Sequence, residues 1–455
     1  MFRIPFPPTA CLPLVALLAV FPTLAHEMGN DVVQQDSAAH SGDSLPSLVI
    51  QALERNPGIR AMEFQVKALH GSPGHTWYLE PPQVGVEFYQ SPVRSFPNPL
   101  KNQMEVDYSV QQAFPFPGKI GSRKHAEHKH AEMGDFELEA LKRKIVREVK
   151  TDYYEVYLLD RRAEINRESQ ALISRLIESA RRQYEVGIGR QADILRAQSE
   201  LTSLKTDSIT LEQSRQAMVG ILNALLNRKI GNPLEVADSI TPAEIDFPQD
   251  RLQPLLESNH PVLKAMKSSI QMREAEKSVA KKEYLPDFML GGSYKNMLEM
   301  PSGTHGGELQ DYWSVMISMN VPFAFWSLPK YKAAVVQSEA NLDQAEQEYL
   351  DMRNMVIARA HAALLKSESS RKLALISRKV LVPQAQQALE STLAGYQGGK
   401  GEFMALLDAF RTSLMAKENS EMALMRLLSS QAELEEAVGL SLEDIRNKIT
   451  EGDGK

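Results

Sequence analysis

Three histidines lie close together in residues 124–130, and their spacing is the first feature of the sequence that suggests chemistry. His125 and His128 are three residues apart, which can place two imidazole rings on one face of a helix. Methionine thioethers suit soft cations such as Cu(I). The residues of these two kinds are His26, His125, His128, His130, Met289, Met297, Met300, Met316 and Met319. Polar surface histidines and packed methionines explain the pattern more simply, so the sequence predicts no metal site.

The sequence holds no other arrangement that an enzyme would need. It contains no nucleophile paired with a base, no phosphate-binding glycine loop, no HExxH motif and no nucleotide-binding pattern. The formal net charge of −7 is mild, whereas a nucleic-acid-binding surface is basic. The sequence therefore predicts a protein that is not an enzyme, has no cofactor and binds no nucleic acid.

Acidic and apolar residues alternate in two segments, at residues 82–90 and 103–114. Glu87 lies in the first segment, and Glu105 and Asp107 lie in the second. An alternation with period two predicts β-strands, and each segment is close to the 9–11 residues with which a tilted strand crosses a bilayer. The apolar face consists of Val84, Val86, Phe88, Met104, Val106, Tyr108 and Val110.

If the apolar face contacts lipid, the acidic face points into a water-filled lumen, because charges on the lipid face are penalised. The predicted lumen residues are Glu87, Glu105, Asp107 and Asp287. They would make a channel mildly favourable to cations. A solvated sheet face in an ordinary protein explains the same alternation, and the residues alone do not decide between the two.

Two glycine-containing stretches match each other along the chain, which indicates an internal duplication. The matching pairs are Tyr184 with Tyr396, Gly187 with Gly399, and Gly189 with Gly401. Glycine permits the positive φ angles that a tight turn between two helices needs. Asp193, Glu402 and Asp408 lie near these turns, so we expect that they form charged constrictions or ion pairs there.

Long helices are predicted on both sides of each turn. No glycine or proline occurs between Gly134 and Gly187, and the apolar residues recur at steps of three and four, which is helical spacing. The sequence predicts long helical hairpins at about 118–228 and 329–438, with the first arm of each on the order of 100 Å long. Pro383 lies inside the second hairpin and should kink the helix or remove one hydrogen bond.

The duplication extends beyond the hairpins and defines the domain organisation. The segment 53–62 resembles the segment 256–266, and further strands are predicted at about 286–295 and 311–323. Each half thus contains short helices, two strands and a hairpin. The predicted parts are repeat 1 (48–230), a linker (231–249), repeat 2 (250–439) and a short charged tail (440–455).

The N-terminus has the pattern of a secretory signal peptide over residues 1–25, with an early arginine, an apolar core and small residues before His26. An uncleaved membrane anchor is the alternative. The only cysteine, Cys11, lies within this segment, so the mature chain would have no thiol. Residues 26–47 are polar and lack periodicity, which predicts a flexible arm.

Four membrane-length strands per chain cannot close a barrel by themselves. The bare strand edges would leave backbone groups unpaired in lipid, which costs several kcal/mol per group. We therefore expect the chain to form oligomers. Three copies would supply twelve strands, which lies within the range of known outer-membrane barrels, and twelve long helices.

Several motifs together resemble the TolC-type outer-membrane efflux factors. They are the corner Phe114-Pro-Phe-Pro-Gly118, the two Tyr-x-x-Gly-x-Gly turns, the run Val382-Pro-Gln-Ala385 and the repeated strand-strand-helix-helix order. The resemblance covers nearly all of the mature chain. Many such relatives carry an acylated N-terminal cysteine, and Cys11 is badly placed for that role because it precedes the apolar core.

This resemblance implies an α+β fold in which each chain forms one third of a homotrimeric 12-stranded outer-membrane β-barrel, continuous with a long periplasmic α-helical barrel. It implies that the helical turns face a periplasmic adaptor protein. It also implies an inner-membrane pump of the resistance-nodulation-division class, most similar to the heavy-metal branch.

The sequence therefore predicts a passive channel that exports metal cations or small toxic compounds through the outer membrane, in contact with its lipid. The alternative is a secreted or periplasmic coiled-coil structural or adhesive protein. That alternative gives no reason for four membrane-length strands with alternating polarity.

Overall fold

A computed structural model of the chain describes residues 44–76, 78–89, 91, 93–98, 105–244, 251–298 and 310–452. The predicted signal peptide, Cys11, His26 and Met300 lie outside the described residues.

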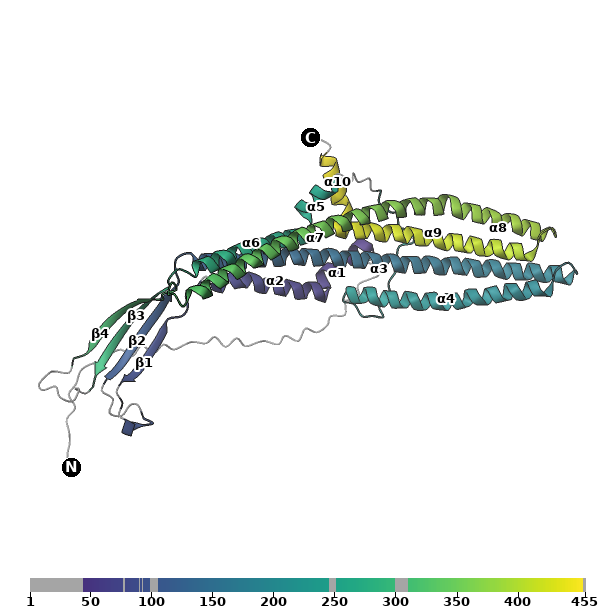
Figure 1. Cartoon of the computed structure of the whole chain (residues 1–455). Helices are drawn as coiled ribbons and strands as arrows, with labels where there is room; N and C mark the ends of the chain where they lie inside the picture. Colours follow the sequence, from purple (N-terminus) through teal and green to yellow (C-terminus); the bar gives the residue numbers. More distant parts are fainter. Residues whose placement is uncertain are drawn as a thin grey trace, which may run out of the picture. The chain divides into compact units, whose positions relative to one another are not determined.

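The described elements follow the same order twice along the chain (Figure 1). The first half contains α1 (Leu45–Arg55), α2 (Pro57–Thr76), β1 (Gln83–Tyr89), the 3-10 turn η1 (Val93–Ser95), β2 (Glu105–Phe114), α3 (Lys119–Glu185) and α4 (Gln191–Leu225). The second half contains α5 (Leu252–Asn259), α6 (Pro261–Lys282), β3 (Phe288–Met297), β4 (Tyr312–Met319), α7 (Leu328–Ile376), the π-helical turn η3 (Ser377–Leu381), α8 (Val382–Gln397), α9 (Phe403–Val438) and α10 (Leu442–Gly452).

The two ends of the described chain differ from the sequence prediction. Helix α1 begins at Leu45, inside the predicted flexible arm, because Pro46 suits the first turn of a helix, where its missing N–H is not needed. Helix α10 occupies most of the predicted tail, and its Ile445 is 1% exposed. Ile445, together with the partly buried Leu442, packs this largely charged helix against α5, α7 and α9.

The four strands form one antiparallel sheet in the order β1-β2-β3-β4. Its central pair, β2 and β3, joins the two halves of the chain, with Phe114 opposite Phe288 and Glu105 opposite Met297. Strand β4 ends at Met319, before the predicted boundary of 323. The backbone of Asn320 still bonds with that of Asp287, but Pro322 has no N–H with which to continue the ladder.

Helix α3 is the central helix of the fold, because it packs against α1, α2, α4, α6 and α9. The hairpins α3–α4 and α7–α9 lie side by side (Figure 1), joined by the contact between α3 and α9. An apolar cluster near the turns of both hairpins includes Ile173, Leu406 and Phe410. A second cluster around Val149 and Leu222 lies at the other end of α4.

Pro383 is accommodated by the π-helical turn η3. The amide of Val382 donates to the carbonyl of Ser377, five residues earlier, where an α-helix would use the residue four earlier. This wider turn relieves the contact between the proline ring and the carbonyl of Lys379, which would be too close in a regular helix. At Pro383, where the sequence predicts a kink or a lost hydrogen bond, the helix thus has a widened turn.

The segment Leu234–Ala243, which we call the strap, crosses the helices between the two halves. The carbonyl of Leu234 accepts a hydrogen bond from Arg215 on α4 at 3.1 Å. The amide of Ala237 donates to the Tyr153 hydroxyl at 3.1 Å. The carbonyl of Ala243 accepts from Gln431 on α9 at 2.6 Å. The strap is thus fastened to α3, α4 and α9.

No helix in the described part of the chain is both long enough and apolar enough to cross a membrane.

A buried lysine fixes the corner between the sheet and α3. Gly118, with φ of 91°, turns the chain after Pro117, and Lys119 follows with only 1% exposure. Its Nζ donates to the Asp287 carboxylate and to the Leu285 carbonyl, each at 2.9 Å. Burial tends to raise the pKa of Asp287, but the bonds from Lys119 and the Phe116 amide outweigh burial and lower it.

We predict that Lys119→Met destabilises the protein by about 3 kcal/mol, because removing one partner of a buried ion pair leaves the other groups unsatisfied. The thermal unfolding midpoint, followed by circular dichroism in detergent, should fall. Lys332→Met is the matched control, because Lys332 is exposed. Equal midpoints for the two variants would contradict this role of Lys119.

Candidate functional site

The polar face of the sheet carries three of the predicted lumen residues. The strand register places Glu87 opposite Asp107 and Tyr89 opposite Glu105. It also brings in Lys295 of β3, opposite Asp107, which the sequence analysis did not identify. The Nζ of Lys295 lies 3.2 Å from a Glu105 oxygen and 3.6 Å from an Asp107 oxygen. The charge of this acidic face is thus partly neutralised.

Asp287 lies apart from this group, at the corner between the sheet and α3, and its place in a lumen stays a prediction. It precedes β3, and its carboxylate accepts hydrogen bonds from the Phe116 amide and Lys119 at the corner. Its position next to a strand suggested a lumen residue. The actual partners lie about 170 residues away in the chain, and no local pattern indicates them.

The opposite face of the sheet is apolar and exposed in the single chain. Because residues directly opposite in an antiparallel pair share a face, the register collects side chains from all four strands there. The exposed members are Val84, Val86, Tyr108, Val110, Phe114, Phe288, Leu290, Tyr294, Trp313, Val315, Ile317 and Met319. A continuous exposed apolar patch of this kind marks a surface that contacts a membrane or another protein.

The glycines of the two helical turns have the geometry that the sequence predicts. Gly187 and Gly399 have φ of 82° and 72°, in the left-handed region that disfavours a side chain. A Cβ on Gly189 would lie 2.9 Å from the Tyr184 amide nitrogen. A Cβ on Gly401 would lie 2.9 Å from that of Tyr396.

The two matching tyrosines have different environments. Tyr184 is 48% exposed, whereas Tyr396 is 3% exposed and packs against Phe403 with ring centroids 5.4 Å apart. Gln183 of the first turn donates to the Tyr396 carbonyl at 2.6 Å and links the two turns. Burial, with a smaller effect of Asp193, raises the pKa of Tyr396. Its buried hydroxyl has no partner among the described residues.

The acidic residues near the turns are accessible to different degrees. Asp193 is half-buried in the first turn of α4. Glu402 and Asp408 are exposed, and Glu402 occupies the N-cap position of α9 without a side-chain cap. Asp408 lies near Arg411, whose guanidinium donates to Glu200 of α4 at 3.0 Å. The role of these residues as a gate stays a prediction.

The histidine segment lies on α3 without forming a metal site. His125 and His128 are exposed and His130 is half-buried. Among the described residues, no three histidine, cysteine or acidic side chains come together as metal ligands would.

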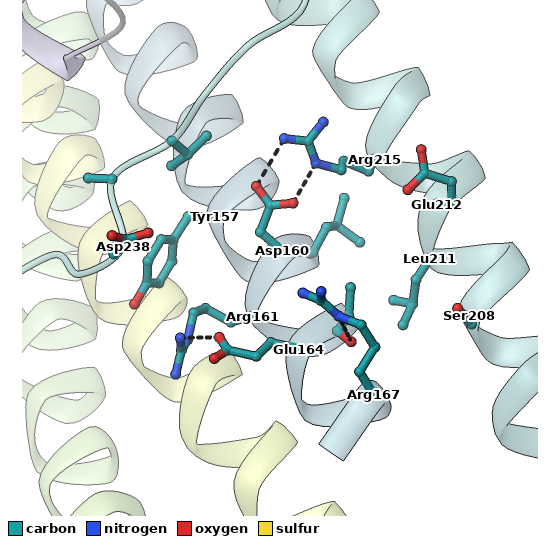
Figure 2. A pocket seen from close by; sticks show the side chains of 14 residues that line it. Tyr157, Asp160, Arg161, Glu164, Arg167, Ser208, Leu211, Glu212, Arg215 and Asp238 are labelled. Atoms are coloured by element: carbon teal, nitrogen blue, oxygen red, sulfur yellow. Dashed lines mark hydrogen bonds and ion pairs between the residues drawn. The ribbon is translucent and has the colours of Figure 1, made fainter. Parts of the chain in front are cut away.

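The structure also contains a cavity of about 600 Å³ between α3, α4 and the strap. Figure 2 shows Asp160 of α3 and Arg215 of α4 pointing toward one another across it. The guanidinium of Arg215 pairs with Asp160 and also holds the strap at Leu234. Arg161 and Glu164 pair beside them (Figure 2). The sequence analysis missed this cavity, because its residues come from three separate segments.

The duplicated fold, the exposed apolar sheet face and the paired helical turns define the class of outer-membrane efflux proteins. The sequence profile of the outer membrane efflux protein family matches residues 48–228 and 252–440. The chain therefore belongs to this family, as its motifs predict. Membership places it in the outer membrane.

Individual relatives are distant but extensive matches. TolC of Vibrio cholerae is 23% identical over 323 residues, which cover 70% of this chain and 73% of TolC. The cobalt-zinc-cadmium resistance protein CzcC of Cupriavidus metallidurans is 21% identical over 300 residues, which cover 66% of this chain and 69% of CzcC.

Solved structures show the same fold. CusC, whose structures concern folding and transmembrane channel formation, superposes with a TM-score of 0.75 at 15% identity. The superposition covers 89% of this chain and 96% of CusC.

We predict that Gly401→Ala distorts the second turn at a cost of about 1–3 kcal/mol, because the added methyl group overpacks the Tyr396 backbone. Gly395→Ala near the C-terminal end of α8 is the control, since nothing lies within 4 Å of its Cβ position. Amide hydrogen exchange around residues 394–402 should be faster in the first variant only. Equal exchange in both would show that Gly401 does not set the geometry.

Proposed function

We propose that three copies of this chain form a passive channel through the outer membrane. The observation that carries the proposal is the sheet, which combines an exposed apolar face with two open edges. Strands β1 and β4 each pair on one side only in the described structure. In lipid, unpaired backbone groups cost several kcal/mol each, so pairing of β4 with β1 of the next copy would relieve both edges and close a 12-stranded barrel.

The helical hairpins support the same assembly. Each chain would supply α3, α4, α9 and the arm from α7 to α8, and three chains would supply twelve long helices for a tube in the periplasm. Apolar residues on the outer arms are exposed in the single chain, including Ile209 of α4 and Leu373 and Ile376 of α7. Burial between copies would remove this apolar area from water, which is favourable.

A tripartite efflux system is the setting that we propose for this channel. The helical turns would dock onto a periplasmic adaptor, and an inner-membrane pump of the resistance-nodulation-division class would supply the energy. The cargo would be metal cations or small toxic compounds. The likeness to CzcC, named for cobalt, zinc and cadmium resistance, supports metal cations, and the acidic sheet face agrees with it.

The channel proposal is tested by reconstitution of the full-length protein into a planar lipid bilayer. We expect discrete conductance steps, and a mass in detergent of three chains. A monomeric protein that stays in solution without detergent and gives no conductance would support the alternative of a coiled-coil structural protein.

We predict that Lys295→Met makes the channel more selective for cations. Glu87, Glu105, Asp107 and Lys295 together carry a charge of −2 per chain on one sheet face, and loss of the lysine makes this −3. The reversal potential in a salt gradient should shift toward the equilibrium potential of the cation. Lys330→Met, which changes an exposed lysine outside the sheet, should cause no shift. Unchanged selectivity in Lys295→Met would mean that this face does not line the lumen.

We also predict that Asp193→Ala or Asp408→Ala raises the conductance severalfold. The proposal is that these carboxylates narrow the entrance between the helical turns in the closed state. Asp207→Ala is the control, because Asp207 is exposed on α4 further from the turn. A single-channel recording in which all three variants match the parent protein would exclude Asp193 and Asp408 as gate residues.

A further inference from the structure

A second cavity, of about 560 Å³, lies on the other side of the strap from the first. Its walls come from α3, α9, the strap, and the region where α7 passes through η3 into α8. The volume lies within the range of small-molecule sites. The cavity therefore connects the strap with the π-helical turn that accommodates Pro383.

One wall of this cavity is apolar. Leu375 of α7 and Leu424 and Leu427 of α9 line it together with Ile165 of α3. Leu375 is 47% exposed, and a ligand in the cavity would cover it. An apolar ligand body would gain from covering these side chains, because the contact removes apolar surface from water.

Two arginines place positive charge on one side of the cavity, and Arg378 lies near enough to Glu421 to act on its pKa. Arg371 and Arg378 line the cavity from α7 and η3, two helical turns apart, and both are exposed. Within the described chain, neither has a hydrogen-bond or ion-pair partner. The other cationic residues of the lining are paired, Arg161 with Glu164 and Lys417 with Glu168.

Two buried polar atoms in the lining are also without partners. They are Nε of Arg161 and Oε2 of Glu421. Burial is the main reason that the pKa of Glu421 is raised, so this carboxyl takes up a proton more readily and can then donate a hydrogen bond. An unsatisfied buried polar group is unfavourable, and a polar group of a ligand would relieve that cost.

The strap side of the cavity has the opposite charge, since it contributes Asp238 of the strap and Glu244, the residue that follows the strap. The cavity is thus polarised, with these two carboxylates on one side and the guanidinium groups of Arg371 and Arg378 on the other. A ligand with one anionic end would be oriented by this polarity. Guanidinium groups bind sulfonates and carboxylates through strong charge-assisted hydrogen bonds.

We propose that this cavity is a binding site for a small amphipathic anion. The anionic group binds Arg371 and Arg378, and the apolar body covers Leu375, Leu424 and Leu427. A ligand in this place connects α9 and the strap with η3, and it restrains the segment of the second hairpin that departs from α-helical geometry. The lining includes no residue of the sheet or of the helical turns, and the site does not depend on the channel proposal.

The test is isothermal titration calorimetry of the full-length protein in a non-ionic detergent, with 2-naphthalenesulfonate as the probe. We expect saturable binding that Arg371→Ala/Arg378→Ala weakens at least about tenfold. The control Lys372→Ala/Lys379→Ala removes the same charge from neighbouring exposed residues outside the cavity lining and should bind like the parent. The uncharged 2-naphthalenesulfonamide should bind at least about tenfold more weakly than the sulfonate.

A cavity-filling variant locates the site independently of charge. Ala374→Trp places a large side chain in the lining and should abolish binding, while circular dichroism stays that of the parent. With the probe bound, amide exchange should slow in residues 374–382. Three results would each overturn the proposal. The first is an equal loss of affinity in the arginine double variant and the lysine double variant. The others are equal affinity for the sulfonate and its uncharged analogue, and binding that survives Ala374→Trp. Because no conductance is measured, failure here leaves the channel proposal untouched.

Discussion

Unpaired backbone groups at the two edges of the sheet are the constraint on which this structure depends. Strands β1 and β4 each have one neighbour in the described chain, and edge strands attract further strands because their N–H and C=O groups need partners. The apolar face beside these edges adds the hydrophobic effect. Both demands can be met by copies of the same chain and by lipid. In the trimer that we propose, the long helices could assemble only in the arrangement that a closed sheet permits.

The two halves of the chain share one order of elements but differ in their local contacts. The turns share the same glycines, yet Tyr396 is buried against the first hairpin while Tyr184 is exposed. The second hairpin also contains the π-helical turn, for which α3 has no counterpart in the described chain. The two hairpins can therefore respond differently to the same partner. The second hairpin has the less regular pattern of helical hydrogen bonds.

Local patterns in the sequence predicted much of this structure. Alternation indicated the strands, helical spacing indicated the long hairpins, and the glycine match indicated the turns, because each signal lies within a few residues. The contacts that these patterns did not indicate join residues that are distant in the chain. Asp287 belongs to the Lys119 corner, Lys295 joins the acidic residues through strand pairing, and the cavities beside the strap combine several helices.

The pairing of β2 with β3 has a consequence for how the chain folds. The strands are separated by α3, α4, the strap, α5 and α6. Pairing between such distant segments forms slowly, because a long loop must close first. Helical hairpins consist of local contacts and form earlier. The newly made chain therefore passes through a stage with formed helices and exposed apolar strands, in which aggregation is the main hazard and a chaperone that holds extended segments has the most to protect.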